Sequence, residues 1–247
     1  AFQGVGNGTE VDFVQVHRNK DDGIEMFGGS VDIKHGVVTG CVDDQFDWTY
    51  GWNGNAQFVV IQLWDDAADR GFEADNNKNV PEGTPVSHPV LANFTIVGGT
   101  NDQTDANQGM LFRRGTEVEL YNSIVTGHYG GAILDVDDDA TFTSYTEVNL
   151  VFEDTMFWPL GSTELFDEEP TDPVAVSTIF NSQPGNTTNV DPELNDPLSQ
   201  TNPDFRPQTT LTGGAAPADP FFDDVTYKGA MDDTTDWTAG WTTHVIN

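Results

Sequence analysis

Residues 19–29 read NKDDGIEMFGG, and nearly the same acidic phrase returns twice further along the chain. It returns as GCVDDQFDWTYGW from residue 40 and as WDDAADRGFEADN from residue 64. The three copies align at Asp21, Asp43 and Asp69. Their spacing is 22 and then 26 residues. Repeats of about 20 to 30 residues are typical of solenoids, in which each repeat forms one coil. The spacing therefore predicts stacked coils rather than three separate motifs.

Short apolar stretches within the repeats are typical of β-strands. Several alternate apolar and polar residues and end at Gly, Asn or Asp, as in VDFVQV (11–16), AQFVVIQL (56–63) and LANFTIV (91–97). No long stretch keeps the 3.6-residue apolar period of a helix. We therefore predict an all-β fold, a right-handed parallel β-helix whose equivalent residues stack about 4.8 Å apart. A β-sandwich with coincidental repeats is the alternative.

The alignment assigns side chains to columns that run along the coils. The predicted inward apolar column comprises Ile24, Phe46, Phe72, Met110 and Ile133. The predicted outward carboxylate columns are Glu25, Asp47 and Glu73, and Asp21, Asp43 and Asp69. NFTIVGG and NSIVTGH repeat with an offset of 29 residues, which predicts an amide ladder that begins with Asn93 and Asn122.

The texture of the chain changes near residue 158. Residues 1–157 carry the repeats and are predicted to form the β-helix coils. Residues 158–247 are rich in Pro and Asp and have few strand signals, so we predict a long irregular wrapping segment. Because the end of a solenoid is an unpaired edge, it needs a cap. The expected capping or docking residues are Phe221, Phe222, Tyr227, Trp237 and Trp241.

Charge limits the classes of partner. The 247 residues include 41 acidic and 9 basic ones, so the formal net charge is −32. This balance argues against nucleic acid and anionic membranes, which need a basic face, and it favours cations. The acidic residues are interleaved with apolar ones, which indicates a folded chain. One cysteine, Cys41, excludes a disulfide within the chain, and no apolar stretch is long enough to span a membrane.

Four stretches carry a family resemblance: GNGTEVDFVQVHRNKDDGIEMFGGSVDIKH, DDQFDWTYGWNGNAQFVVIQ, DRGFEADN and the closing YKGAM…DWTAGW. They resemble a family of secreted, largely uncharacterised bacterial proteins of marine type with a right-handed parallel β-helix. The resemblance implies secretion or display at the cell surface. It also implies that the chain is the C-terminal half of a longer precursor, which agrees with its start inside running structure. It brings no catalytic residues.

The carboxylate columns predict a calcium site. Carboxylates about 4.8 Å apart repel one another unless a cation lies between them, and Ca²⁺ takes six to eight oxygen ligands. The candidate ligands are Asp21, Asp22, Glu25, Asp43, Asp44, Asp47, Asp69, Glu73 and Asp75. No stretch matches an EF-hand loop. A solvated acidic face without bound metal is the alternative.

The sequence motifs that suggest an enzyme are less specific than the repeats. VDDQ (42–45) and GHYGG (127–131) suggest a polysaccharide hydrolase, but the Arg-Ile-Lys triplet expected after the histidine is absent. A calcium-dependent lyase needs a basic residue near the metal, for which Lys20 and Arg70 are candidates. The five histidines, His17, His35, His88, His128 and His244, have no metal-binding spacing, so a copper or zinc site depends on folding.

Aromatic residues beside the acidic phrase suggest a sugar-binding surface. Tyr50 and Trp52 are candidate glycan contacts, whereas Trp48 is expected to pack inside a coil. Together these features favour a secreted or cell-surface, calcium-stabilised structural or binding module. We expect it to assemble with itself or with an N-terminal half of the same precursor along the edge formed by residues 3–16. A β-helix enzyme acting on polysaccharide is the alternative.

Overall fold

The acidic repeats are rungs of a parallel β-helix. The computed structural model describes residues 1–66, 68–102 and 106–245. One sheet, called sheet A here, contains β1 (Phe2–Val5), β3 (Ile24–Gly29), β5 (Phe46–Thr49), β7 (Arg70–Asp75), β9 (Gln108–Arg113), β12 (Ala132–Val136) and β15 (Glu164–Phe166). The second, sheet B, contains β2 (Glu10–His17), β4 (Asp32–Thr39), β6 (Asn55–Gln62), β8 (Val90–Val97), β10 (Val118–Tyr121), β11 (Ile124–Gly127), β13 (Leu150–Glu153), β14 (Met156–Pro159) and β16 (Thr187–Thr188).

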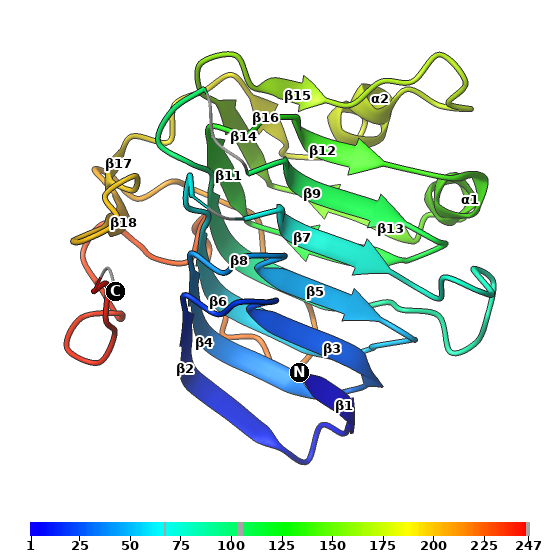
Figure 1. Ribbon diagram of the computed structural model, residues 1–247, viewed down its shortest axis with the longest axis horizontal. Coiled ribbons are helices and arrows are strands. Elements are labelled where there is room, and N and C mark those ends of the chain that lie inside the picture. The colour runs from blue at the N-terminus through cyan, green and yellow to red at the C-terminus, as the bar shows by residue number, and fades with distance from the viewer. Residues whose placement is uncertain (67, 103–105, 246–247) are drawn as a thin grey trace.

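The two sheets alternate along the chain, which confirms the predicted fold. The strands within each sheet are parallel, and each pairs with the equivalent strand of the next coil. In Figure 1 the chain climbs from β1 at the bottom to β15 at the top. The strands of sheet A run to the right in front, and those of sheet B return behind, so the coil is right-handed.

The core is a stack of inward side chains between the sheets. Ile24 pairs with Phe46, Phe46 with Phe72, and Phe72 with Met110, as predicted. The next member is Leu134 and not Ile133, which corrects the predicted register by one residue. Both residues are apolar and fully buried, so the sequence could not decide between them.

Sheet B bends once in each coil, at a residue with left-handed backbone. The bend residues, with φ near +50°, are Phe13, His35, Phe58, Asn93, Asn122 and Asp154. Asn and Asp tolerate this conformation better than other non-glycine residues. Asn93 and Asn122 do share a column, because Ala92 pairs with Tyr121 and Thr95 with Ile124.

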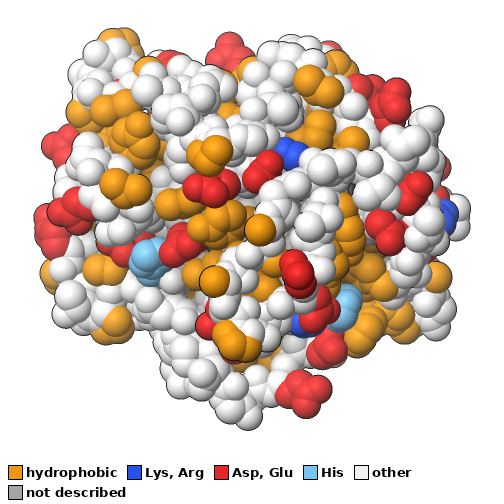
Figure 2. Space-filling model, turned by 180° about the vertical axis from the view of Figure 1, so that it is seen from behind, with side chains coloured by type: hydrophobic (Ala, Val, Ile, Leu, Met, Phe, Trp, Pro, Cys, Tyr) orange, Lys and Arg blue, Asp and Glu red, His pale blue; other side chains and the backbone are white. Residues whose placement is uncertain are grey.

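The C-terminal segment, residues 208–245, lies along the outer face of sheet B. The Asn93 amide donates to the Tyr227 carbonyl (2.7 Å), and the Asn122 amide donates to that of Gly214 (3.2 Å). The bend column thus holds this segment. Under it, Val37, Val60 and Val97 of sheet B contact Phe205, Ala230 and Met231 in a second apolar cluster. Figure 2 shows this face, where apolar and acidic side chains are mixed and Lys or Arg is scarce.

The ends of the β-helix differ. At the end formed last, α2 (Val176–Asn181) packs Phe180 on Phe157, with ring centroids 3.9 Å apart. The predicted aromatic residues therefore dock on a face, while a short helix covers the end. Parallel pairing continues to Thr188, past the boundary predicted at residue 157. α1 (Asp139–Thr146) follows β12, and β17 (Leu194–Asp196) pairs with β18 (Asp204–Pro207).

At the opposite end, β1 and β2 are the edge strands of sheets A and B. Within the described ranges, no helix has the length and apolar character needed to cross a membrane.

Candidate metal centre

The outer face of sheet A carries the predicted carboxylate column. Glu25 pairs with Asp47, and Asp47 pairs with Glu73, on three consecutive parallel strands. Successive residues of a strand point to opposite faces. Because Ile24 and Phe46 are buried in the core, their neighbours Glu25 and Asp47 point outward.

Among the described residues, carboxylate oxygens converge in three groups on these strands and on the turns that lead into them. Each group offers three oxygens that lie within 4.8 Å of one another. The groups are Asp21, Asp22 and Asp43; Asp22, Glu25 and Asp47; and Asp43, Asp44 and Asp69. Seven of the nine predicted ligands are therefore brought together by the coil, and consecutive coils supply them to each group.

Asp47 is a buried carboxyl in the group Asp22, Glu25 and Asp47. Its exposed fraction is 8%, and its Oδ1 has no hydrogen-bond partner among the described residues. Burial, with the charges of Glu73, Asp22, Asp44 and Glu25, raises the pKa of Asp47 to about 10. A buried carboxylate without a donor is unfavourable unless it is neutralised by a proton or a cation.

The pKa values of the neighbouring carboxyls, Asp22 and Glu25, are also raised. Burial, followed by the charges of Glu25 and Asp43, raises the pKa of Asp22 to about 7. Burial also raises the pKa of Glu25. The group Asp22, Glu25 and Asp47 thus places three carboxyls where water is partly excluded, so that each ionises less readily than it does in solvent.

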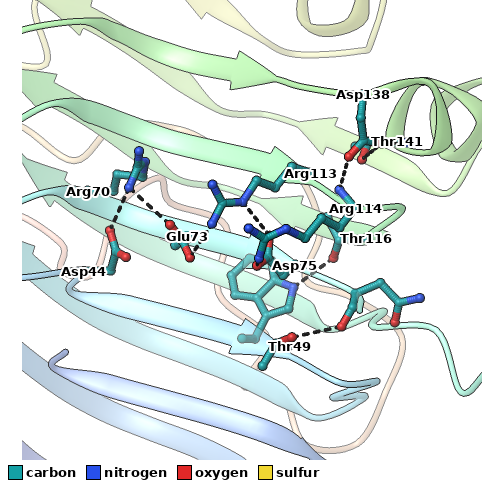
Figure 3. Close-up of polar contacts among 12 residues, drawn as sticks. Asp44, Thr49, Arg70, Glu73, Asp75, Arg113, Arg114, Thr116, Asp138 and Thr141 are labelled. Atoms are coloured by element: carbon teal, nitrogen blue, oxygen red, sulfur yellow. Dashed lines mark hydrogen bonds and ion pairs between the residues drawn. The ribbon is translucent and has the colours of Figure 1, made fainter. Parts of the chain in front are cut away.

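Three arginines contact Glu73 and Asp75, the two predicted ligands that lie on β7 (Figure 3). Arg113 contacts Glu73 Oε2 (2.7 Å) and Asp75 Oδ1 (2.8 Å), and Arg114 also contacts Asp75. Arg70 contacts Glu73 Oε1 (3.1 Å). Glu73 and Asp75 belong to none of the carboxylate groups among the described residues. The structure therefore corrects their predicted place as ligands, because these arginines already supply their counter-charge.

The two candidate glycan contacts differ in exposure. Tyr50 is 48% exposed, and its ring stacks against Phe27 with centroids 6.1 Å apart. Trp52 is fully buried, and its Nε1 donates to the Val31 carbonyl (3.1 Å). Trp52 is a core residue, so its assignment as a glycan contact is wrong. Trp48 is also fully buried, as predicted, and its Nε1 donates to Thr116 Oγ1 (3.0 Å).

The histidines lie outside the carboxylate groups found in the described chain. His128 of GHYGG contacts Asp102 Oδ1 (3.0 Å). His88 lies between Glu117 (2.9 Å) and Glu119 (3.3 Å), a cluster that the sequence analysis missed. The nearby Glu119 carboxylate, followed by the charge of Glu117, outweighs burial and raises the pKa of His88. No local signal links residue 88 to residues 117 and 119, because stacking of coils brings them together.

Comparisons with known proteins identify the architecture. A family model described as a pectate-lyase-like β-helix domain matches residues 1–195. Neither the curated proteins nor the solved structures contain a match. The matched range covers all strands of sheets A and B, including the carboxylate groups.

Proposed function

Because the chain belongs to the pectate-lyase-like β-helix family, we propose that its acidic face binds one calcium ion and that it acts as a secreted or cell-surface structural or binding module. The observation that carries the proposal is that Oδ1 of the buried Asp47 has no hydrogen-bond partner among the described residues. Carboxylate oxygens of Asp22 and Glu25 lie within 4.8 Å of an Asp47 oxygen. Hard oxygen ligands of this kind suit Ca²⁺, which accepts irregular geometry and completes its shell with water.

The ion would stabilise the fold by joining coils. Glu25 lies on β3 and Asp47 on β5, so one ion contacts two neighbouring rungs. A ligand that binds only the folded state raises its stability in proportion to the logarithm of ligand concentration. This chain has one cysteine, and metal binding supplies a cross-link that a disulfide within the chain cannot.

The test is calcium titration of the full chain after dialysis against a chelator. We expect one equivalent of Ca²⁺ by calorimetry and a higher Tm in 1 mM Ca²⁺ than in EDTA. Mg²⁺ at the same concentration should raise Tm less, because it demands small, near-octahedral sites. A Tm that is the same in Ca²⁺, Mg²⁺ and EDTA, with no binding heat, would rule the site out.

Self-assembly is supported by the first coil. β1 and β2 are edge strands, and Phe2, Val11 and Val16 near them are only partly buried against the core. An open edge with apolar neighbours is a template for another strand. We propose that a second copy of the chain pairs here. Sedimentation equilibrium should show a concentration-dependent dimer that Val11→Lys disrupts; a monomer at all concentrations would contradict pairing between copies.

An enzymatic role is favoured by one further observation. Arg70 lies on the same face as the carboxylates, with its side chain 14% exposed. In a calcium-dependent lyase, the metal would hold the substrate carboxylate, and the charged Arg70 guanidinium would stabilise the negative charge that develops on the substrate as it loses a proton to water. Incubation with acidic polysaccharides in Ca²⁺ should then yield shortened, unsaturated chains. Turnover that Asp47→Asn abolishes would replace the purely structural role with this one.

A further inference from the structure

Arg70 occupies a position that carboxylates hold in the coils below it. It stands two residues before Phe72, where Asp22 and Asp44 stand before the paired Ile24 and Phe46. The column therefore runs from two aspartates to a guanidinium. Its next member is Gln108, which pairs directly with Arg70.

The guanidinium lies among the oxygens of the third carboxylate group. Arg70 Nη1 donates to Asp69 Oδ2, lies 3.1 Å from Glu73 Oε1 and is 3.7 Å from Asp44 Oδ1. Its Nε donates to Gln108 Oε1 (2.8 Å), which fixes the plane of the group. Figure 3 shows Arg70 reaching toward Asp44 and Glu73 from the same face.

Asp44 remains incompletely satisfied despite this neighbour. It is 4% exposed, and in the part of the chain that the structure describes its Oδ1 has no hydrogen-bond partner, because 3.7 Å to Arg70 exceeds hydrogen-bond length. Oxygens of Asp43, Asp44 and Asp69 lie within 4.8 Å of one another. The same oxygens could therefore surround a small cation.

We propose that Arg70 is a resident counter-cation that closes a second divalent-cation site at Asp43, Asp44 and Asp69. Of the two groups that share no residue, the acidic face therefore fills only one, at Asp22, Glu25 and Asp47. This inference rests on the calcium site proposed above. It adds the residue that sets the stoichiometry.

The chemistry of arginine explains the substitution. A guanidinium keeps its charge at all physiological pH values and can contact several carboxylates at once through its fork of donors. Removal of one partner from a largely buried ion cluster leaves uncompensated charge, which is strongly unfavourable. In a variant without the guanidinium, a cation from solvent is the available replacement.

The experiment measures bound Ca²⁺ per chain by equilibrium dialysis, for the full chain and for Arg70→Gln. We expect one ion for the wild type and two for Arg70→Gln, with a larger rise in Tm on adding Ca²⁺. Arg70→Lys keeps the charge and should bind one. Arg18→Gln is the matched control, because Arg18 pairs with Asp66 on the surface and not with the column (2.8 Å).

Asp44→Asn tests the inference without removing a counter-charge. Asp44 belongs to the closed site, so this variant should still bind one ion, whereas Asp47→Asn should bind none. The inference is overturned if the wild type binds one ion and folded Arg70→Gln binds no more than one, if the wild type binds two, or if Asp44→Asn abolishes binding. Absence of binding by both the wild type and Arg70→Gln would instead reject the calcium site itself. Binding by Arg70→Gln alone would support the closed site and reject the open one.

Discussion

Glu25 and Asp47 lie directly opposite one another on the parallel strands β3 and β5, and both point away from the core. Like charges opposite one another on neighbouring strands are destabilising. The burial of Asp47 increases this effect, because there is less solvent to screen its charge. The pair therefore creates a demand for a proton or a cation at one defined place on the molecule.

Asp47→Asn should affect the Tm differently in the absence and in the presence of Ca²⁺. In the folded state the pKa of Asp47 is raised to about 10, so near neutral pH the metal-free chain must protonate this carboxyl on folding, which lowers its stability. The neutral amide should give a metal-free Tm equal to or above that of the wild type, and the Ca²⁺-dependent rise should be lost. Asp224→Asn, at an exposed position, should leave both Tm values unchanged. A full Ca²⁺-dependent rise in Asp47→Asn would contradict the assigned site.

Phe72→Ala should destabilise the centre of the coil stack. The Phe72 ring lies 5.6 Å from Phe46, 5.5 Å from Trp48 and 5.3 Å from Phe94, measured between centroids. Loss of a fully buried phenylalanine costs about 3–5 kcal/mol in unfolding free energy. Urea denaturation measures this loss. Val190→Ala, at a half-exposed position, should change the free energy by less than about 0.5 kcal/mol.

Asn93→Ala should loosen the C-terminal segment. The hydrogen bond from the Asn93 side-chain amide to the Tyr227 carbonyl is lost, and alanine tolerates a φ of +57° less well than asparagine does. We expect a loss of about 1–3 kcal/mol in unfolding free energy and faster proteolysis within residues 208–245. Mass spectrometry of the cleavage products locates the cuts. Asn195→Ala, on an exposed residue outside the bend column, is the control, and equal cleavage in both variants would contradict the role of Asn93.

His88 should make stability depend on pH. Its pKa is raised in the folded state, chiefly by the neighbouring Glu119 carboxylate. The stabilisation is complete below the pKa of an unfolded histidine, about 6.5, and is lost as pH rises through the higher folded value. His88→Gln should lose about 1 kcal/mol at pH 6, and the difference from the wild type should shrink at pH 9.

Denaturation curves at the two pH values measure the effect of His88. His128→Gln removes a histidine that pairs with a single carboxylate, Asp102, whose exposed fraction is 52%. Because the Asp102 carboxylate is largely solvated, this control should lower the stability less than His88→Gln does at pH 6. A His88→Gln difference that stays constant between pH 6 and pH 9 would show that charge on His88 does not stabilise the fold.

The sequence by itself determined the coil and most of the carboxylate column. Its repeats set the register of Ile24, Phe46 and Phe72, and period-two alternation then placed Glu25, Asp47 and Glu73 on the opposite face. These relations depend on spacing within and between repeats, which a linear chain displays directly.

Only the tertiary structure decided which carboxylates have partners. Asp75 is neutralised by Arg113 and Arg114 from the next coil, whereas no described residue donates a hydrogen bond to Asp47 Oδ1. Trp52 looked like a surface aromatic beside the acidic phrase, but it is buried. The sandwich of His88 between two glutamates was also invisible in the sequence. The burial and the ion pairing of a side chain depend on how coils of unequal length stack. A few extra residues in one turn change which side chains of neighbouring coils come into contact.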